Sequence, residues 1–516
     1  MKTESRCLRM IKKKMVRVLT VAGLLACLAS GCASGGSSVG KEAAADEIKK
    51  GGFTVAASCH DPQILREGDT YYMFGSHMVG AKCQDLRKWN YFANGVDAAN
   101  TLFDNLLTEP YAAFDFVGKN TDNGYSVWAS NVIYNETMKK YVMYFCTTSS
   151  YVKSTLCFAT ADNIEGPYTY VDTILYSGYG KSNISETNLY DVLGKNADIS
   201  RYLEYGGYNN KEWPNCIDPA IFTDADGRMW MNYGSWSGGI FLLEIDPTTG
   251  YPIYPVDDKD ADPYYGYRLI GGGHHSAEGP YIQYDAENGY YYLFVSYGDL
   301  QSDGGYQIRQ FRSEKPTGPY VDVAGKTLED QDDHFNYGLK MMGNYTFPSL
   351  NYTYMAPGGQ STFQDDDGKY YITYHQRFDD GTEYHEPRVH QMYTNEDGWF
   401  VAAPFATMGE TLSEKGYKKS DVSGTFYVVN HGTDISSKIR EAEAYTFADG
   451  KVTGGEKSGT YEVKEGTDYI TITLDGVVYK GVLMEMTDEA ENPVFCFSAA
   501  GDNEETLWGV QYIKKE

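Results

Sequence analysis

The chain has 516 residues, a formal net charge of −27 at pH 7 and 15% aromatic residues, with 47 tyrosines among them. This length allows more than one buried core, and the negative charge excludes a nucleic-acid partner, because phosphate binding requires clustered Lys and Arg. Abundant Tyr together with 55 glycines favours an all-β protein with many tight turns, and aromatic residues on an acidic surface suit a neutral polymer such as a glycan.

The N-terminal segment, residues 1–31, has the features of a targeting signal. A basic cluster over residues 12–17 precedes an apolar stretch over 18–28, which is too short to span a bilayer. Small residues then lead to Cys32, and this pattern resembles a bacterial lipoprotein signal; the alternative is an ordinary secretory peptide. We expect an exported protein that is either lipid-anchored through Cys32 or secreted, touches the membrane only through that lipid, and has a flexible tether over 32–52.

Six cysteines remain once Cys7, Cys27 and Cys32 are set aside with the signal. Their spacing contains no paired metal motif such as C-x₂-C. Several lie in apolar strand-like runs and are predicted to be buried thiols, while the spacing leaves disulfides open in an exported protein. The six are Cys59, Cys83, Cys146, Cys157, Cys216 and Cys496.

A similar unit recurs about five times between residues 53 and 405. Each copy begins with a short strand, passes through an acidic or glycine-containing turn such as "EGDT" or "DADG", and continues in an aromatic strand. The period is roughly 60 to 90 residues, longer than the usual propeller repeat. It fits four-stranded blades with long loops, so we predict a five-bladed β-propeller in which each unit's first strand faces the axis. Loop-like insertions at 95–126, 178–213 and 325–356 are expected to shape a groove.

Three of the units carry a carboxylate at the first strand. These are Asp61 in "HDPQI", Asp218 in "IDPAIF" and Glu278 in "EGPYI", and Asn131 takes the equivalent position in the second unit. An inverting glycosidase requires one carboxylate that activates water and one protonated acid that donates to the leaving oxygen. A third negative charge keeps the donor protonated. Asp-Pro alone is a common turn opener, so the prediction depends on all three matched contexts; Glu165, in a similar "EGPY", follows a turn and is predicted to lie on the surface.

The three motifs in this order resemble glycoside hydrolase family 43. Members of that family fold as five-bladed propellers and include arabinanases, α-L-arabinofuranosidases and β-xylosidases. The resemblance covers residues 53–405 and implies that Asp61 is the general base, Asp218 modulates the pKa of the acid, and Glu278 is the general acid. The family's second unit often reads Trp-Ala-Pro-Asp, whereas this chain has "WASN", so the amide of Asn131 stands where an acidic contact is expected.

Two further stretches resemble the endo-α-1,5-L-arabinanase branch of the family, namely residues 229–246 and 356–399. The resemblance implies a Ca²⁺ ion near the propeller axis, held by one histidine and by waters. His375 matches the histidine of that motif, and His385 and His390 are candidates of lower rank. The aromatic residues of the expected cleft either stack on sugar faces or wedge between blades. The expected substrate contacts are Trp128, Asn131, Ser235, Trp236 and Tyr281.

Residues 406–516 form a second unit with short alternating strands, such as "SGTFYVVNHG" and "DYITITLDGVVYKGVLMEM". We predict a small β-barrel or sandwich without a catalytic constellation. It is similar to the appendage of longer extracellular arabinanases.

The leading functional hypothesis is a monomeric, inverting endo-arabinanase that cleaves α-1,5-linked arabinofuranose chains. An α-L-arabinofuranosidase or β-xylosidase on the same scaffold is the nearest alternative. A glycan-binding surface lipoprotein without catalysis is an alternative from another class. A propeller for protein interactions is a third, and it leaves the three placed acids unexplained.

Overall fold

The computed structural model describes residues 39–328 and 337–515. Strands dominate this part of the chain, which contains one short α-helix, α2 (Leu189–Leu193), and a few 3-10 turns. The signal segment, Cys32 and residues 32–38 of the expected tether lie outside the described residues. Over the residues that are described, no helix is long and apolar enough to cross a membrane.

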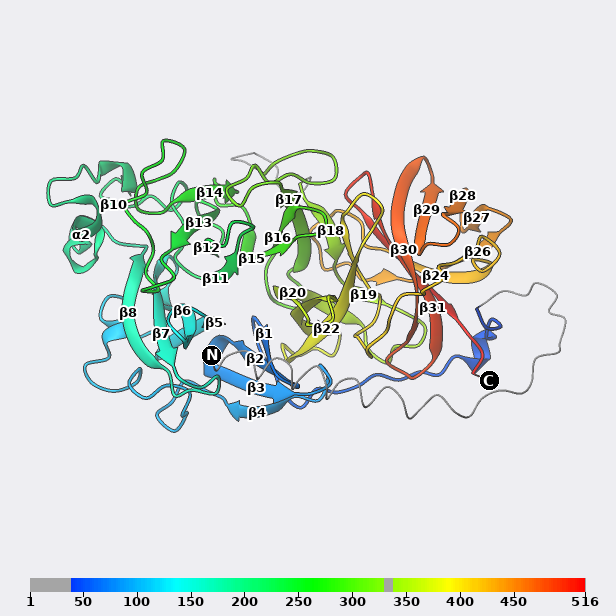
Figure 1. Cartoon of the computed structure of the whole chain (residues 1–516), viewed down its shortest axis with the longest axis horizontal. Helices are drawn as coiled ribbons and strands as arrows, with labels where there is room; N and C mark the ends of the chain where they lie inside the picture. Colours follow the sequence, from blue (N-terminus) through cyan, green and yellow to red (C-terminus); the bar gives the residue numbers. More distant parts are fainter. Residues whose placement is uncertain (1–38, 329–336, 516) are drawn as a thin grey trace, which may run out of the picture. The chain divides into compact units, whose positions relative to one another are not determined.

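Five antiparallel sheets form the blades of a propeller (Figure 1), as predicted. The first blade comprises β1 (Gln63–Glu67), β2 (Thr70–Gly75), β3 (Val79–Cys83) and β4 (Asn90–Ala93). The second comprises β5 (Ser126–Asn135), β6 (Lys140–Ser150), β7 (Lys153–Ala161) and β8 (Thr169–Tyr176). The third comprises β11 (Ala220–Thr223), β12 (Met229–Tyr233), β13 (Ile240–Ile245) and β14 (Tyr267–Ile270), and the fourth β15 (Ala277–Asp285), β16 (Tyr290–Tyr297), β17 (Gln307–Ser313) and β18 (Leu339–Met342). The fifth is built from β20 (Tyr354–Gln364), β21 (Tyr370–Phe378), β22 (His385–Thr394) and β23 (Phe400–Ala402), with β19 (Tyr345–Thr346) at its inner edge.

The first long strand of each blade lies at the centre of the propeller. The inner strands β1, β5, β11, β15 and β20 contact one another in a ring. The second strands are almost continuously buried, as in β6 (KYVMYFCTTSS), because each is covered on both faces by neighbouring blades. All six cysteines of the described residues are buried free thiols, which agrees with the prediction made from their apolar surroundings.

An insertion over residues 178–213 covers one side of the third blade. It contains α2 and the hairpin of β9 (Leu203–Glu204) and β10 (Gly207–Tyr208). The insertion is held by aromatic packing, in which Trp213 stacks on Tyr265 with ring centroids 5.7 Å apart. The backbone of Trp213 also accepts a hydrogen bond from Gly238, which lies in the loop after β12.

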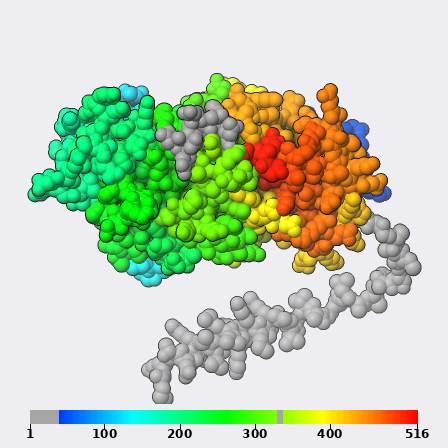
Figure 2. Space-filling model, turned by 90° about the horizontal axis from the view of Figure 1, so that it is seen from above, coloured from blue at the N-terminus to red at the C-terminus, as the bar shows by residue number. Residues whose placement is uncertain are grey.

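The C-terminal domain is a closed eight-stranded barrel, which decides between the barrel and the sandwich left open by the sequence. Its strands are β24 (Gly424–Asn430), β26 (Glu443–Ala448), β27 (Lys451–Gly454), β28 (Lys457–Val463), β29 (Tyr469–Leu474), β30 (Val477–Thr487), β31 (Pro493–Gly501) and β32 (Thr506–Tyr512). The short strand β25 (Arg440–Glu441) leaves the barrel and pairs in parallel with β19 of the fifth blade. Figure 2 shows the orange and red barrel directly against the green and yellow blades.

A buried polar network joins the barrel to the fifth blade. Arg388 of β22 has a fully buried side chain, and its Nη1 lies 2.9 Å from Glu386 Oε2. Tyr354 of β20 donates a hydrogen bond to Glu489, which follows β30 of the barrel. A buried guanidinium is tolerated only when it is paired, so this network ties the two domains together.

The tether prediction does not hold for residues 39–52. Glu42 forms a β-bridge with Ile513, Ala43 N donates to Tyr512 O at 2.8 Å, and Gly51 forms a β-bridge with Leu350 of the propeller. The polar, glycine-containing composition suggested a free chain, but these backbone bonds place the segment along the barrel and the fifth blade.

Candidate active site

Each inner strand contains, or is preceded two residues earlier by, a left-handed residue close to the axis. Asp61, Ala129, Asp218, Gly279 and Gly359 have φ values of +54°, +48°, +57°, +56° and +57°. Pairing with the next strand shifts register at or beside this point in β5, β15 and β20, as expected for β-bulges. Residues other than glycine rarely adopt this backbone conformation, and Asp is among those that tolerate it best. A Cβ on Gly359 would press against Asp61 Oδ1 and lie 2.7 Å from His375 Nδ1.

The three carboxylates therefore occupy two different positions of the repeat. Asp61 and Asp218 are the left-handed residues of blades one and three. Glu278 directly precedes Gly279, the left-handed residue of the fourth blade. It faces the cleft, as does Trp128, which directly precedes the left-handed Ala129. The prediction that Asn131 is equivalent to the acids is wrong by two residues, because Ala129 holds that place in the second blade.

Residues after the left-handed position line a small cavity on the axis. Its volume is about 40 Å³, and each of the five inner strands contributes to its wall. Asn131 and Tyr281 lie here, although both were expected to contact substrate. Asn131 is 3% exposed, and its Oδ1 accepts a hydrogen bond from Ile221 N at 3.1 Å. A cavity of this size holds no sugar ring, so these two side chains belong to the axial packing.

Asp61 is held by a set of short hydrogen bonds. Its Oδ2 accepts from Ser76 Oγ at 2.6 Å and lies 2.8 Å from His60 Nδ1. Ser76 Oγ in turn accepts from Ala129 N at 2.9 Å, so the serine links blades one and two. Burial acts to raise the pKa of Asp61, but the charge of His60 and the hydrogen bonds from His60 and Ser76 outweigh it and lower the pKa. Asp61 is thereby kept ionised, as a base requires.

Glu278 is held on both carboxylate oxygens. Tyr306 Oη donates to Oε1 at 2.7 Å, while Ser235 Oγ and Trp236 Nε1 donate to Oε2 at 3.0 and 2.9 Å. Ser235 and Trp236 are predicted substrate contacts that line the cleft, and the structure also places their polar atoms on the carboxylate. Trp236 is half-buried beside the cleft, whereas Ser235 is 4% exposed. Burial is the largest influence on Glu278 and raises its pKa, against the lowering effect of these donors.

Asp218 lies beside the strand that carries Glu278. Its Oδ2 accepts from the backbone N–H of Gly279 at 3.2 Å, directly after Glu278. Burial raises the pKa of Asp218 well above its usual value, and the negative charges of Asp61 and Glu278 raise it further. Three carboxyl groups in one partly desolvated place cannot all be ionised at low cost, so Asp218 is the member of the cluster whose protonated form is most favoured.

His375 lies next to Asp61 and offers a donor set for a cation. Its Nδ1 is 3.9 Å from Asp61 Oδ1, and its ring stacks on His60 with centroids 4.0 Å apart. Ligand atoms of His60, Asp61 and His375 lie within 4.8 Å of one another. The Nε2 atom of His375 is buried and has no hydrogen-bond partner among the described residues. Burial lowers the pKa of His375 well below its usual value, so its imidazole is neutral and able to bind a metal.

His385 and His390, the candidates of lower rank, lie in different places. The ring of His385 is 5.7 Å from that of His375, and His385 lines a hollow together with His60 and Asp61. His390 is fully buried, bonded to Tyr374 and to the backbone of Ala403, and is not part of the site.

The acids lie on the floor of a cleft made of two connected hollows. One hollow, of about 420 Å³, extends over Asp61 and Asp218 toward Arg377 and His385. The other, of about 550 Å³, extends toward Trp236, Tyr151 and the insertion at 120–122. Both include Glu278, and Trp128 lies at their junction. The cleft therefore continues on both sides of Glu278, as binding of a chain at an internal position requires.

Sequence reasoning missed three residues that contact the acids, namely His60, Ser76 and Tyr306. His60 directly precedes Asp61, and Ser76 ends the "FGS" that is matched by "YGS" at Ser235 in the third blade. That repeated Gly-Ser was a usable signal, because both serines hold a carboxylate. Tyr306 gave no signal, since nothing distinguishes it from the other tyrosines until its hydroxyl is placed beside Glu278.

Comparison with known proteins gives two family matches along the chain. A model described as glycosyl hydrolases family 43 matches residues 192–400, which include Asp218 and Glu278. A model described as a C-terminal lipocalin-like domain matches residues 404–509, which form most of the barrel.

Similar proteins align along most of the chain. The extracellular endo-α-(1→5)-L-arabinanase 2 of Bacillus subtilis (strain 168) is 38% identical over 467 residues, covering 88% of this chain and 92% of that protein. The extracellular endo-α-(1→5)-L-arabinanase of Thermotoga petrophila is 36% identical over 472 residues, covering 88% and 94%. A crystal structure of the family 43 glycoside hydrolase YxiA from Bacillus licheniformis superposes with a TM-score of 0.77 at 36% identity, covering 89% of this chain and 99% of that one.

We predict that Asp218→Asn stabilises the fold at neutral pH. Because the pKa of Asp218 is raised on folding, the folded state binds its proton more tightly, and stability falls as pH rises above the ordinary value of 3.8. An amide does not ionise, so the free energy of unfolding should increase by about 1 kcal/mol at pH 7. The gain should shrink toward pH 4, as measured by urea unfolding.

Asp224→Asn is the matched control with the opposite sign. Burial acts to raise the pKa of Asp224, but hydrogen bonds from Trp230 and Arg228 outweigh it and lower the pKa, so the ionised form stabilises the fold. This variant should lose stability at pH 7. A loss of stability at pH 7 in Asp218→Asn would contradict the electrostatic account of the cluster.

Proposed function

The chain belongs to glycosyl hydrolase family 43, and from that membership we propose that it is an endo-acting hydrolase that cleaves α-1,5-linked L-arabinan with inversion. The observation that carries the proposal is a cleft that passes Glu278 on both sides, with three carboxyl groups on its floor. Relatives at 36–38% identity over most of the chain are extracellular endo-arabinanases. An open cleft admits an internal bond of a polymer, whereas a closed end would select a chain terminus.

In the proposed mechanism Asp61 is the general base. It removes a proton from a water molecule that attacks the anomeric carbon, from the face opposite the leaving group. Its lowered pKa supports this role, because an ionised carboxylate is needed before the step. Ser76 and His60 both bond to Oδ2, so Oδ1 is the oxygen with room to accept the proton.

Glu278 is the proposed general acid, and its contacts indicate which oxygen donates. Ser235 and Trp236 both bond to Oε2, which fills the two lone-pair directions of that atom. Oε1 accepts only from Tyr306 and keeps one direction free. The proton for the leaving sugar oxygen is therefore assigned to Oε1, and Tyr306 is a positioning residue that touches the donating atom.

Asp218 is proposed to keep the acid protonated. Its carboxyl group adjoins the Glu278 segment through the Gly279 N–H, and burial together with the charges of Asp61 and Glu278 raises the pKa of Asp218. A proton shared within this cluster is available to Glu278 when substrate excludes water from the cleft.

We propose that the cation of this site is Ca²⁺ and that His375 holds it together with waters. The neutral imidazole with an unpartnered buried nitrogen fits a metal ligand, and Asp61 supplies a nearby carboxylate oxygen. When bound, such an ion stabilises negative charge on the neighbouring carboxylates. The proton transfers themselves are assigned to Asp61 and Glu278.

We also propose that the protein is exported and held at the cell surface by a lipid on Cys32, as a monomer. The support is the basic and apolar signal followed by small residues and a cysteine. The relatives named as extracellular act outside the cell, where a polymer too large for uptake is accessible.

Incubation with linear α-1,5-arabinan should release a ladder of oligosaccharides early in the reaction. Glu278→Gln and Asp61→Asn should each lower kcat by about 10²- to 10⁴-fold, because each removes one proton-transfer group. Chromatography of the products over time measures both effects, and circular dichroism verifies the fold. Arabinose as the sole early product would overturn endo action, and near wild-type turnover in either variant would overturn the assigned roles.

Tyr306→Phe should move the alkaline limb of the pH–kcat profile to higher pH. The tyrosine hydroxyl donates to Glu278 Oε1 and so stabilises the ionised form; without it the pKa of Glu278 rises, and the acid stays protonated to higher pH. We also expect kcat at the optimum to fall about tenfold through lost orientation. Tyr151→Phe, another tyrosine of the cleft, is the control and should leave the limb in place. An unmoved limb in Tyr306→Phe would show that the contact does not tune the acid.

Calcium should stabilise the wild type but not His375→Ala. Ligand binding to the folded state raises Tm, and loss of the imidazole should weaken Ca²⁺ binding at least tenfold. Thermal unfolding with Ca²⁺ or with a chelator, together with calorimetric titration, measures this. His274→Ala removes a histidine from elsewhere in the cleft and should retain the calcium effect. An equal Tm increase in His375→Ala would remove His375 from the metal site.

A further inference from the structure

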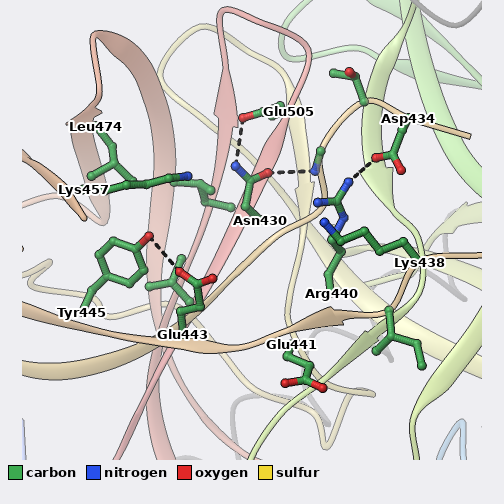
Figure 3. Close-up of a pocket in the computed structure, with 15 residues that line it drawn as sticks. Asn430, Asp434, Lys438, Arg440, Glu441, Glu443, Tyr445, Lys457, Leu474 and Glu505 are labelled. Atoms are coloured by element: carbon green, nitrogen blue, oxygen red, sulfur yellow. Dashed lines mark hydrogen bonds and ion pairs between the residues drawn. The ribbon is translucent and has the colours of Figure 1, made fainter. Parts of the chain in front are cut away.

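A second large cavity lies in the C-terminal barrel, away from the three acids. Its volume is about 630 Å³, within the range of small-molecule binding sites, and it opens beside β25 (Figure 3). Strands β24, β26, β28, β29 and β32 contribute its walls, together with the segment 432–441 that leads to the propeller. The mechanism proposed above uses none of these residues.

The lining combines an apolar floor with a polar rim. Val428, Leu474 and Leu507 form the buried part, at 6%, 5% and 1% exposure. Four carboxylates and three cationic side chains surround them, so the net charge of the lining is close to zero. A strongly charged ligand gains little from such a balanced rim, and the negative charge of the whole chain disfavours a polyanion. Neutral polyols present C–H faces together with hydroxyl donors and acceptors, which match this lining.

The polar groups of the rim are held in place by their own partners. Glu505 Oε2 accepts from Asn430 Nδ2 at 2.9 Å and from Tyr479 Oη at 2.7 Å, and Asn430 Oδ1 accepts from Gly432 N at 2.8 Å. Arg440 is paired with Asp434 across the mouth, as Figure 3 shows. Groups fixed in this way lose little freedom when a ligand binds, which favours affinity.

The cavity is also fixed to the fourth blade. The backbone carbonyl of Asp434 accepts from Gln307 Nε2 at 3.0 Å and from Lys340 Nζ at 2.8 Å. Gly305 packs so closely on Ser436 that a Cβ there would lie 2.8 Å from the Ser436 N atom. The next residue is Tyr306, which bonds to Glu278 in the cleft. The cavity and the cleft are thus joined by a short, bonded path through the fourth blade.

We propose that this barrel cavity is a second carbohydrate site, which binds a neutral furanose segment of the arabinan that the cleft does not cut. The proposal rests on the proposed function for the identity of the sugar. Its own support is the cavity volume, the apolar floor, the balanced rim and the pre-arranged Asn430–Glu505 pair. A second point of attachment keeps the enzyme on a polymer between cuts, because it raises the local concentration of chain at the cleft.

The test is calorimetric titration of the full chain carrying Glu278→Gln with linear α-1,5-arabinohexaose. The expected stoichiometry is two oligosaccharides per chain. Adding Lys457→Ala and Glu443→Ala removes one cation and one carboxylate from exposed positions of the rim and leaves the net charge unchanged. This variant should bind one oligosaccharide, and its retention on insoluble linear arabinan should fall about tenfold.

The matched control carries Lys451→Ala and Glu462→Ala, two exposed barrel residues outside the cavity. It should still bind two oligosaccharides. A stoichiometry of one with the rim intact, or equal behaviour of the rim variant and the control, would overturn the proposal. Rim-dependent binding of oligogalacturonate would overturn the assignment to a neutral sugar. Failure of the proposed function is separate, because it appears as wild-type protein that releases no oligosaccharide from arabinan.

Discussion

The site depends on a backbone constraint that recurs in all five inner strands. The backbone passes through a left-handed residue within each strand or two residues before it, and this turn separates side chains that face the cleft from those that face the axis. Such residues cost about 1–3 kcal/mol each when they are not glycine. The free-energy cost is smaller for Asp than for bulky residues, because its short polar side chain tolerates the conformation. Two of the five positions use this tolerance to place carboxylates at the centre of the propeller.

The same geometry gives the three carboxyl groups of Asp61, Asp218 and Glu278 different pKa values. Asp61 receives hydrogen bonds that favour its ionised form, whereas Asp218 receives one backbone N–H and the repulsion of its neighbours. Glu278 is intermediate, since burial raises its pKa while three donors hold its carboxylate in position. Environment therefore shifts the pKa values of these carboxyl groups in opposite directions within one cluster, which is the requirement of acid–base catalysis by two carboxyl groups.

The barrel contributes to this arrangement although it supplies no acid. Its segment around Asp434 supports the loop before β17, and that loop carries Tyr306 to Glu278. The buried contact of Tyr354 with Glu489 joins the barrel to the fifth blade as well. Through these contacts the barrel supports the cleft. They also fix the barrel's own cavity relative to the three acids.

Local patterns were enough to predict the five-bladed propeller, the β-rich C-terminal domain and the three acids that the structure brings together. Strand period, turn residues and the short motifs around Asp61, Asp218 and Glu278 are properties of neighbouring residues, so they are legible in the chain itself. The partners of those acids were not predictable in the same way. The hydrogen bonds of Ser235 and Trp236 to Glu278 were not foreseen, and Asn131 was aligned with the acids but lies on the axis. A β-bulge changes the direction of every side chain after it, and the partner residues come from different blades. The sequence alone therefore determined which three carboxyl groups meet at the centre of the propeller, while the packing of blade against blade decided which oxygen of each carboxyl group is held by hydrogen bonds and which is left free.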